Sequence, residues 1–519
     1  MNWLNEHILT ILIGFPLGAA GLLLLVKHSN LKIIRWGALF ITIFEFFISI
    51  FLYTNFKPIA QLQFVERIPW IPQWGIDFAV GVDGISLFLV LLTTFLGPIA
   101  VLASWTSIQK SVKGFMVSLL VMESAMVGVF VVTDLFFFYI FWEAMLIPMY
   151  FVIGIWGSGR RIYAAIKFIL FTMLGSLFML VAIIYLFVQT KYQLGHPSLA
   201  FSDLTLLALP MKAQYYLFLA FALSFAIKIP LFPFHTWLPD AHTEAPTAGS
   251  IILAGVLLKM GGYGFIRFCI PLFPKVVPQF VPLLIALAVV GIIYGALMAM
   301  AQPDLKRLVA YSSVSHLGFV VLGIFALTTR SITGGVIQMV NHGLSTGALF
   351  LLVGMLYDRR HTRMISDFGG LARSIPKYST VFIIVVLASI GLPGLNGFVG
   401  EFLILMGSFA TQPTAVVIAT FGVILTAVYL LWMVERVFFG KLDKDENKNL
   451  SDLSKREWSA ILPIILVIVW LGIYPKPVLD RIEPSVRQLV DNYEMTINSE
   501  SSDNDLEIAF KEIQEESRP

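Results

Sequence analysis

The chain has 519 residues, of which 58% are hydrophobic and 13% are charged, and its formal net charge is +3. Soluble domains carry about 25% charged residues, so this composition excludes an ordinary soluble enzyme and indicates an integral membrane protein. Cys269 is the only cysteine, which excludes an intrachain disulfide and a cysteine cluster for zinc or iron–sulfur.

Hydropathy predicts about fourteen transmembrane helices, because each apolar stretch is long enough to cross a hydrocarbon core of about 30 Å. The first stretch follows MNWLNEH, which has no basic n-region and no evident cleavage site, so we expect a retained span and not a signal peptide. The expected spans cover residues 4–26, 33–54, 84–105, 114–133, 135–156, 165–189, 213–236, 247–270, 278–301, 307–328, 332–357, 377–410, 414–439 and 458–475. We expect the charged end of the tail 476–519 to be loosely ordered, because it buries little surface.

Lysine and arginine concentrate in alternate loops. Most of them lie in the first, third, fifth, ninth, eleventh and thirteenth loops or at the span ends beside these loops. These basic residues are Lys27, Lys32, Arg35, Lys110, Lys113, Arg160, Arg161, Lys306, Arg307, Arg359, Arg360, Arg363, Lys441 and Lys444. The other loops hold few basic residues. The positive-inside rule therefore places the odd-numbered loops in the cytoplasm and, with an even number of spans, both termini on the opposite face.

Proline interrupts two of the expected spans, in KIPLFP at 228–233 and in GLPGLNG at 391–397. Proline breaks a helix, and broken backbone at membrane depth is tolerated only inside protein or beside a wet cavity. The two breaks are five spans apart, so two five-span units in series have opposite topologies, as in transporters with inverted repeats. We therefore predict an all-α polytopic membrane protein with two inverted five-helix repeats, each containing a broken helix. Its parts are 1–112 (helices 1–3), 113–270 (first repeat), 278–440 (second repeat) and 441–519 (last helix and charged tail).

Charged residues in the middle of apolar segments are the main functional signal. Lys228, Lys259 and Glu143 each lie in such a segment, where burying a charge costs at least ~2.5 kcal/mol and marks an ion or proton path. Glu143 lies roughly 13 Å along its helix from Asp134, near mid-membrane, with Lys228 as a partner on another span. Burial and a nearby carboxylate act on a lysine in opposite directions, so Lys228 can change protonation when its partner moves. Gly261-Gly262 beside Lys259 leave room for close helix contact.

Further polar residues extend this signal. His316 and His342 lie in the tenth and eleventh spans among serine, threonine and asparagine, and two such histidines favour a hydrated proton path over core packing. Glu401 follows the second break; it either stabilises the start of the second half-helix or acts as a relay, and the symmetric break favours a relay. For Glu123, a structural hydrogen bond and a relay role both remain open.

The segment WLPDAHTEAP at 237–246 resembles a metal cluster, because Asp240, His242 and Glu244 alternate along it. Spacing alone is weak support for a metal site. We expect instead a short loop whose polar groups cap the next helix near Thr247 and line a channel mouth.

Four stretches carry a resemblance to a known family: FFFYIFWEAMLIPMY, KIPLFPFHTWLPDAHTEAPTAGSIILAGVLLKMGGYG, QPDLKRLVAYSSVSHLGF and GLPGLNGFVGEF. They resemble the antiporter-like proton-pumping subunits of respiratory complex I, an NADH-quinone oxidoreductase, and among these its subunit M (chain 4), related to Mrp antiporter subunits. The resemblance covers roughly residues 75–475 and implies fourteen helices, inverted repeats and a central polar axis. The positions that match the axis are Glu143, Lys228, Lys259, His316, His342 and Glu401, with Glu123 and His235 as secondary candidates. Sister subunits usually carry lysine where this chain has Glu401.

The resemblance implies a membrane subunit that translocates protons while quinone is reduced elsewhere in the complex. It implies that NADH, flavin, iron–sulfur and quinone sites lie in other subunits and that this chain holds no cofactor and no metal. The implied partners are sister antiporter-like subunits on either side and the lipid bilayer, with no nucleic acid. The expected location is the inner (plasma) membrane, with a thylakoid or organelle membrane as an alternative. Two other functions remain open: a subunit of a cation/proton antiporter or membrane-bound hydrogenase, and an inert scaffold.

Overall fold

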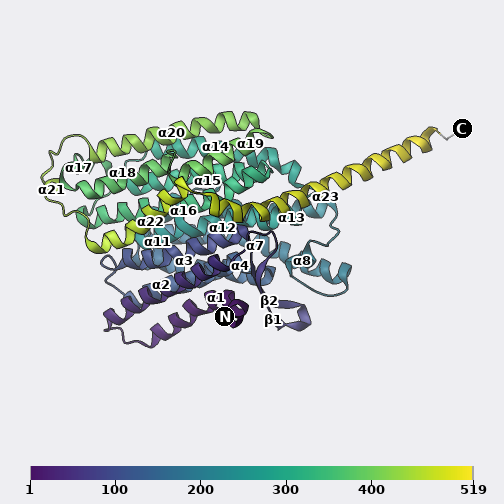
Figure 1. The fold of residues 1–519 in the computed structure, drawn as a ribbon, viewed down its shortest axis with the longest axis horizontal. Coiled ribbons are helices and arrows are strands. Elements are labelled where there is room, and N and C mark those ends of the chain that lie inside the picture. Colours follow the sequence, from purple (N-terminus) through teal and green to yellow (C-terminus); the bar gives the residue numbers. More distant parts are fainter. Residues whose placement is uncertain (1, 517–519) are drawn as a thin grey trace.

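A computed structural model describes residues 2–516, with side chains described for residues 6–498, as a bundle of roughly parallel and antiparallel helices (Figure 1). Within this described part, 12 helices are long and apolar enough to cross a membrane. Most are single helices: α1 (Asn2–Leu25), α2 (Leu31–Asn55), α3 (Gly84–Ser104), α4 (Val112–Val131), α7 (Arg161–Leu194), α14 (Val277–Met300), α15 (Leu305–Phe325), α16 (Thr329–Arg360), α20 (Pro413–Phe438) and α22 (Lys455–Ile473). The span Leu135–Trp156 consists of α5 (Leu135–Ala144) and α6 (Leu146–Trp156). The chain is therefore a multi-pass membrane protein.

The two other expected spans are the ones that the sequence predicts to be interrupted, and each is built from two shorter helices. Helix α9 (Met211–Lys228) ends at Lys228, and α10 (Trp237–Glu244) follows after a turn. Helix α18 (Pro376–Ile390) ends at Gly391, whose φ of +85° is natural for glycine, and α19 (Asn396–Phe409) follows. Both breaks are confirmed, while the total of fourteen helices stays a prediction.

The span Thr247–Leu272 is less regular than expected. It contains α11 (Thr247–Ile252), a π-helical turn η2 (Leu253–Leu257), α12 (Leu258–Gly264), a second π turn η3 (Phe265–Cys269) and α13 (Ile270–Leu272). A π turn bonds each residue five positions along the chain and is frequent at functional sites. Lys259 is the second residue of α12, two positions after the end of η2, so the lysine lies where the helix changes its winding.

Two matched backbone motifs relate the halves of the chain. Asp134 begins α5, its carboxylate accepts the backbone N–H groups of the first turn, and it pairs as an antiparallel bridge with Ala200. Asp304 begins α15 with the same capping geometry and pairs in the same way with Met364. Short helical segments follow each bridge: α8 (Phe201–Leu204) after the first, and η4 (Ile365–Asp367) with α17 (Leu371–Ser374) after the second. The two motifs lie at opposite ends of the bundle, as the positions of α8 and α17 show (Figure 1).

The loops that are rich in lysine and arginine meet at one end of the bundle, here called the basic face. Hydrogen bonds connect them: Lys113 donates to Leu24, the Trp156 indole donates to Lys110, and Leu305 donates to Arg363. Helix α21 (Asp445–Lys448) lies at the same end (Figure 1).

The opposite face carries a β-hairpin that the sequence analysis did not predict. Strands β1 (Gln63–Ile71) and β2 (Ile76–Val82) pair antiparallel through the short helix η1 (Pro72–Trp74). Gly75 at the turn has a φ of +59°, and a Cβ there would lie 2.0 Å from the carbonyl oxygen of Pro197. The hairpin tip therefore packs tightly on the loop after α7. The Glu66 carboxylate of β1 accepts the N–H of Leu9 at 2.8 Å, which places the start of α1 on this face.

Helix α23 (Lys476–Glu516) crosses the same opposite face and then projects beyond the bundle (Figure 1). Its first turns are anchored, because the Arg481 guanidinium lies 4.5 Å from the ring centre of Tyr53 and the Ser485 hydroxyl accepts the N–H of Gly84 at 3.0 Å. Helix α23 reaches Glu516, and the loose order expected of the charged end of the tail stays a prediction. Residues 517–519 lie outside the described part.

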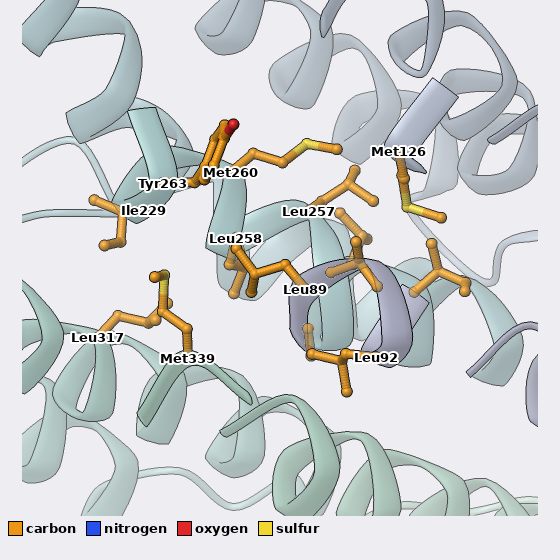
Figure 2. Close-up of a cluster of buried hydrophobic side chains, with 14 of the residues drawn as sticks. Leu89, Leu92, Met126, Ile229, Leu257, Leu258, Met260, Tyr263, Leu317 and Met339 are labelled. Carbon is orange, nitrogen blue, oxygen red and sulfur yellow. The ribbon is translucent and has the colours of Figure 1, made fainter. Parts of the chain in front are cut away.

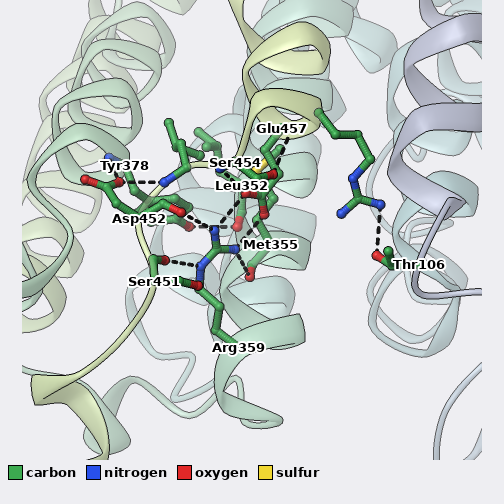
Figure 3. A network of polar contacts seen from close by, with 11 residues as sticks. Thr106, Leu352, Met355, Arg359, Tyr378, Ser451, Asp452, Ser454 and Glu457 are labelled. Atoms are coloured by element: carbon green, nitrogen blue, oxygen red, sulfur yellow. Dashed lines mark hydrogen bonds and ion pairs between the residues drawn. The ribbon is translucent and has the colours of Figure 1, made fainter.

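A polar network on the basic face connects α16, α18 and α22 (Figure 3). The Arg359 guanidinium donates to both carboxylate oxygens of Glu457, at 2.6 and 2.8 Å, and to the carbonyl of Met355. Asp452 accepts the N–H of Tyr378 at 2.9 Å, and the Tyr378 hydroxyl donates to Leu352. The network connects the start of the second broken span, at Tyr378, to the last span.

Candidate functional site

Lys259 is fully buried at the centre of the bundle. Its ammonium lies 2.7 Å from Nδ1 of His342 on α16, and it donates to the carbonyl of Ala254 in the π turn η2. Because the ammonium is a donor only, Nδ1 of His342 is the acceptor and its Nε2 carries the ring N–H. Gly261 brings the helix carrying Lys259 against the end of α9, since a Cβ there would lie 2.6 Å from the N of Ile229. The close contact expected from the paired glycines is confirmed.

His316 and Glu401 continue the polar line from His342. The two imidazole rings have centroids 5.8 Å apart at 60°. His316 Nδ1 lies 3.0 Å from Oε1 of Glu401, which also accepts the amide of Gln338 at 3.2 Å. Among the described residues, Nε2 of each histidine has no hydrogen-bond partner. The structure thus brings four of the expected residues together, from α12, α15, α16 and α19.

Glu143 and Lys228 form a separate, looser part of the site. Lys228 is buried at the end of α9, and its ammonium lies 5.2 Å from the ring centre of Trp142 and 5.9 Å from that of Phe168. It has no hydrogen-bond partner among the described residues. Glu143 is half-buried, within electrostatic range of Lys228, and its carboxyl is directed to Ser176 on α7. The two charges face each other without a closed ion pair.

Apolar side chains surround the segment Leu257–Tyr263 on both sides (Figure 2). Leu89 and Leu92 of α3 lie on one side, and Leu317 of α15 and Met339 of α16 lie on the other. All four are buried. No hydrogen bond or ion pair of the described side chains connects Lys228 with Lys259, so the polar line is interrupted between the two lysines.

The segment from Trp237 to Glu244 is a buried helix and not the loop we expected, and the capping role is wrong. Pro246 precedes the helix at Thr247 and gives no side-chain cap. Proline is tolerated in the first turn of a helix, which is where Pro239 stands in α10. The carboxylate of Asp240 pairs with Lys167 at 2.8 Å, and that of Glu244 accepts the hydroxyl of Ser158 at 2.9 Å.

The expected channel mouth stays a prediction, although a pocket lies at this place on the basic face. Its volume is about 520 Å³, and Glu244, Thr247, Lys306, Asp358 and His361 are among its lining residues. The Lys306 ammonium donates to the carbonyl of Ala245 at its edge. The described residues include no cluster of three or more histidine, cysteine, aspartate or glutamate side chains that fits a metal ion.

Sequence reasoning missed several residues of the site. His242 is fully buried, stacks on Phe350 with ring centroids 4.6 Å apart, and has two ring nitrogens without a partner among the described residues. Asn341 and Asn396 exchange hydrogen bonds at 2.7 and 3.2 Å across the second break. An amide directly after a helix break was the available signal for Asn396, whereas His242 was hidden by its motif-like neighbours.

The two secondary candidates lie apart from this line. His235 is buried in the turn before α10, where its ring stacks on Phe232 and meets Tyr294 edge-on. Glu123 on α4 faces Glu45 on α2. Within the part of the chain that the structure describes, neither side chain forms a hydrogen bond with Lys259, His316, His342 or Glu401.

Residues 132–426 match the family model described as NADH:quinone oxidoreductase/Mrp antiporter, TM. The chain is 45% identical over 502 residues to NADH-quinone oxidoreductase subunit M of Rhodobacter capsulatus, with 94% of this chain and 97% of that protein covered. It is 43% identical to NADH-ubiquinone oxidoreductase chain 4 of Marchantia polymorpha, with 93% and 96% covered.

Two solved structures share the fold. A chain of respiratory complex I from Thermus thermophilus with bound NADH aligns with a TM-score of 0.84 and 33% identity, covering 93% of this chain and 99% of that chain. A chain of the Mrp complex from Dietzia sp. DQ12-45-1b aligns with a TM-score of 0.82 and 19% identity, covering 94% and 98%. The second similarity shows the fold alone.

Proposed function

The chain belongs to the NADH:quinone oxidoreductase/Mrp antiporter family of membrane subunits, and we propose that its buried lysines, histidines and glutamates form the route along which it moves protons. It is a proton-translocating membrane subunit of an NADH-quinone oxidoreductase, respiratory complex I. Two direct contacts support the route best, that of Lys259 with His342 and that of His316 with Glu401.

The chemistry of this line follows from its hydrogen bonds. Lys259 donates a proton to Nδ1 of His342, which then releases the proton on its Nε2. Nε2 of His316 takes that proton, and Nδ1 of His316 releases one to Oε1 of Glu401. An imidazole can accept on one nitrogen and donate from the other near neutral pH, so each histidine passes a proton without rotating.

The interruption between Lys228 and Lys259 acts as the control point of the route. Lys228 has no hydrogen-bond partner, so a movement that brings Glu143 closer favours its charged form and a movement away favours its neutral form. The apolar layer around Leu257–Tyr263 must hydrate or shift before a proton passes (Figure 2). Protons therefore do not leak when the complex is at rest.

The two halves of the chain are inverted repeats, 113–270 and 278–440. The matched Asp134 and Asp304 motifs support this arrangement, because each begins the second span of its repeat and each bridges to the loop that follows the third. Opposite topology gives the two broken helices access to opposite faces. The pocket beside Lys306 provides entry on the basic face, which faces the cytoplasm.

NADH, flavin, iron–sulfur and quinone bind in other subunits, and sister antiporter-like subunits flank this chain in the bilayer. A cation/proton antiporter or membrane-bound hydrogenase is the less supported assignment, since the Mrp similarity is 19%. An inert scaffold does not account for buried, unpaired Lys228.

Affinity purification of this chain from its native membrane tests the assignment. We expect the NADH-binding and iron–sulfur subunits of complex I to co-purify, and the reconstituted complex to acidify or alkalinise vesicles when NADH is oxidised. Recovery with cation/proton antiporter subunits in their place would refute it.

A further inference from the structure

A pair of buried carboxyls lies outside the proposed proton route. Glu45 on α2 is fully buried, and Glu123 on α4 is 2% exposed. The two side chains interact electrostatically where α2 packs on α4. Among the described residues, neither carboxyl oxygen of Glu45 has a hydrogen-bond partner. Oε1 of Glu123 has none either. Two carboxyls in this position are costly to bury unless they carry protons.

The two residues lie at the same depth. Glu45 follows Arg35 by ten residues on α2, and Glu123 follows Lys113 by ten residues on α4. Each distance is about 15 Å at 1.5 Å per residue. Arg35 and Lys113 are held on the basic face, where they donate to Ile108 and Leu24. The basic groups of both helices are therefore too far away to neutralise either carboxyl.

The surroundings of the pair are shaped to hold it. On α3, a Cβ at Gly97 would lie 2.2 Å from Oε1 of Glu123, so only glycine leaves space for the carboxyl. One turn away, the hydroxyls of Ser49 and Thr94 lie 2.7 Å apart and extend the polar seam between α2 and α3. Helix α3 contains no acidic or basic residue.

The other helices packed around the pair contribute no counter-ion at this depth. Helices α1, α5, α6 and α12 contact α4. Apart from tyrosines, the described side chains of these four helices include four charged or titratable groups, which are Glu6, His7, Glu143 and Lys259. Glu6 and His7 begin α1 near the opposite face, and Glu143 is directed to Ser176. The ammonium of Lys259 contacts His342. Apolar side chains of α3 separate Lys259 from the two carboxyls, because Leu92 packs on Gly343 and Leu96 packs on Gly255.

From this geometry we propose that Glu45 and Glu123 form a proton-sharing carboxyl pair, a proton-binding site separate from the central axis. Two carboxyls in contact cannot both be ionised without strong repulsion, so the pair keeps at least one proton between them. Loss of that proton leaves a negative charge on both groups, whereas gain of a second leaves a neutral pair. The two groups therefore titrate as one coupled unit.

Infrared difference spectroscopy of the purified, intact complex tests this, because a protonated carboxyl has a C=O stretch that an ionised one lacks. In a pH titration we expect two protonated-carboxyl steps that disappear together in the Glu45→Gln/Glu123→Gln variant. In Glu45→Gln, the step of the remaining Glu123 should shift by about one pH unit or more, because coupled groups perturb each other by at least that amount. Glu123→Gln should have the same effect on Glu45.

Glu66→Gln is the matched control. The Glu66 carboxylate accepts two backbone N–H groups and a hydroxyl at the start of α1, apart from the pair, so its replacement should leave the coupling between Glu45 and Glu123 unchanged. Glu45→Asp keeps both carboxyls and should keep two coupled steps, so the coupling remains measurable where the amide prevents assembly. Steps that do not shift in either single variant, or no protonated-carboxyl signal from the pair at neutral pH, overturn the proposal. The readout is independent of pumping, so it does not depend on the proposed route.

Discussion

The ammonium of Lys259 lies 2.7 Å from Nδ1 of His342, between α12 and α16 at the buried centre of the bundle. This contact joins the two halves of the chain, because Lys259 belongs to the first expected repeat and His342 to the second. On the proposed route, a proton that leaves Lys259 passes from one half to the other in a single transfer.

Replacement of this lysine is the most direct test of that transfer. Lys259→Met keeps the length and apolar stem of the side chain but removes the proton. We expect NADH-driven proton translocation in vesicles to fall by ~100-fold or more, the usual contribution of a positioned acid–base group, while the complex still assembles. Lys191→Met, at an exposed lysine near the end of α7, is the control and should pump normally. Pumping by assembled Lys259→Met at the wild-type ratio would exclude the residue from the route.

A second substitution separates charge from protonation at Lys228. Arginine keeps the positive charge but does not release its proton, so Lys228→Arg should impair pumping nearly as strongly as Lys228→Ala. The measurement is the number of protons translocated per NADH in vesicles with assembled complex. Lys212→Arg makes the same change at the exposed start of α9 and should have no effect. Full pumping by Lys228→Arg would mean that Lys228 supplies only a fixed charge.

Much of this site was predictable from the sequence, because a charge in an apolar segment stands out by composition alone. Lys228, Lys259 and Glu401 were found in this way, and proline marked both helix breaks, together with glycine at the second. Pair contacts were less predictable. Glu45 is 78 residues from Glu123, so only the packing of α2 on α4 shows that they meet. The expected Glu143–Lys228 pair is more open than the sequence suggested, since Lys228 faces the ring of Trp142.

Local backbone features were also beyond the sequence analysis. The π turn at Leu253–Leu257 has no evident signal in the sequence, and it lies where Leu96 of α3 packs closely on Gly255. The hairpin at 63–82 lies in an interval that hydropathy describes only as non-spanning. Helix α10 was expected to be a loop because of its polar residues, but burial on all sides overrides that preference.

Accessibility at the two broken helices tests the inverted repeats. With Cys269 replaced by alanine, Thr236→Cys after the first break and Leu392→Cys after the second provide single exposed thiols. We expect a membrane-impermeant thiol reagent to label Thr236→Cys from the basic face and Leu392→Cys from the opposite face. Labelling of both from one side of sealed vesicles would contradict the inverted arrangement.

The Arg359–Glu457 contact should support stability and not proton transfer. Both side chains are 9% exposed, and removal of one partner from a buried ion pair costs about 3–5 kcal/mol. Arg359→Met should therefore lower the thermal stability of the purified complex. Arg456→Met, which removes a more exposed arginine that donates to Thr106 at 2.9 Å, should cost at most about 1 kcal/mol. Equal effects of the two substitutions would show that the network in Figure 3 contributes little.

Glu401 ends the polar line, where Oε1 lies 3.0 Å from His316 Nδ1 and accepts the amide of Gln338. A relay at this position must gain and lose a proton, which requires a carboxyl and not only a hydrogen-bonding group. Glu401→Gln keeps the shape but cannot ionise, so we expect proton uptake and quinone-linked turnover to fall together in assembled complex. Glu401→Asp should retain part of the proton uptake and part of the turnover. The control Glu435→Gln, at an exposed site on α20, should retain the full wild-type values of both. Wild-type behaviour of Glu401→Gln in both measurements would assign Glu401 to stabilising the start of α19, and the proton would then leave the line before it.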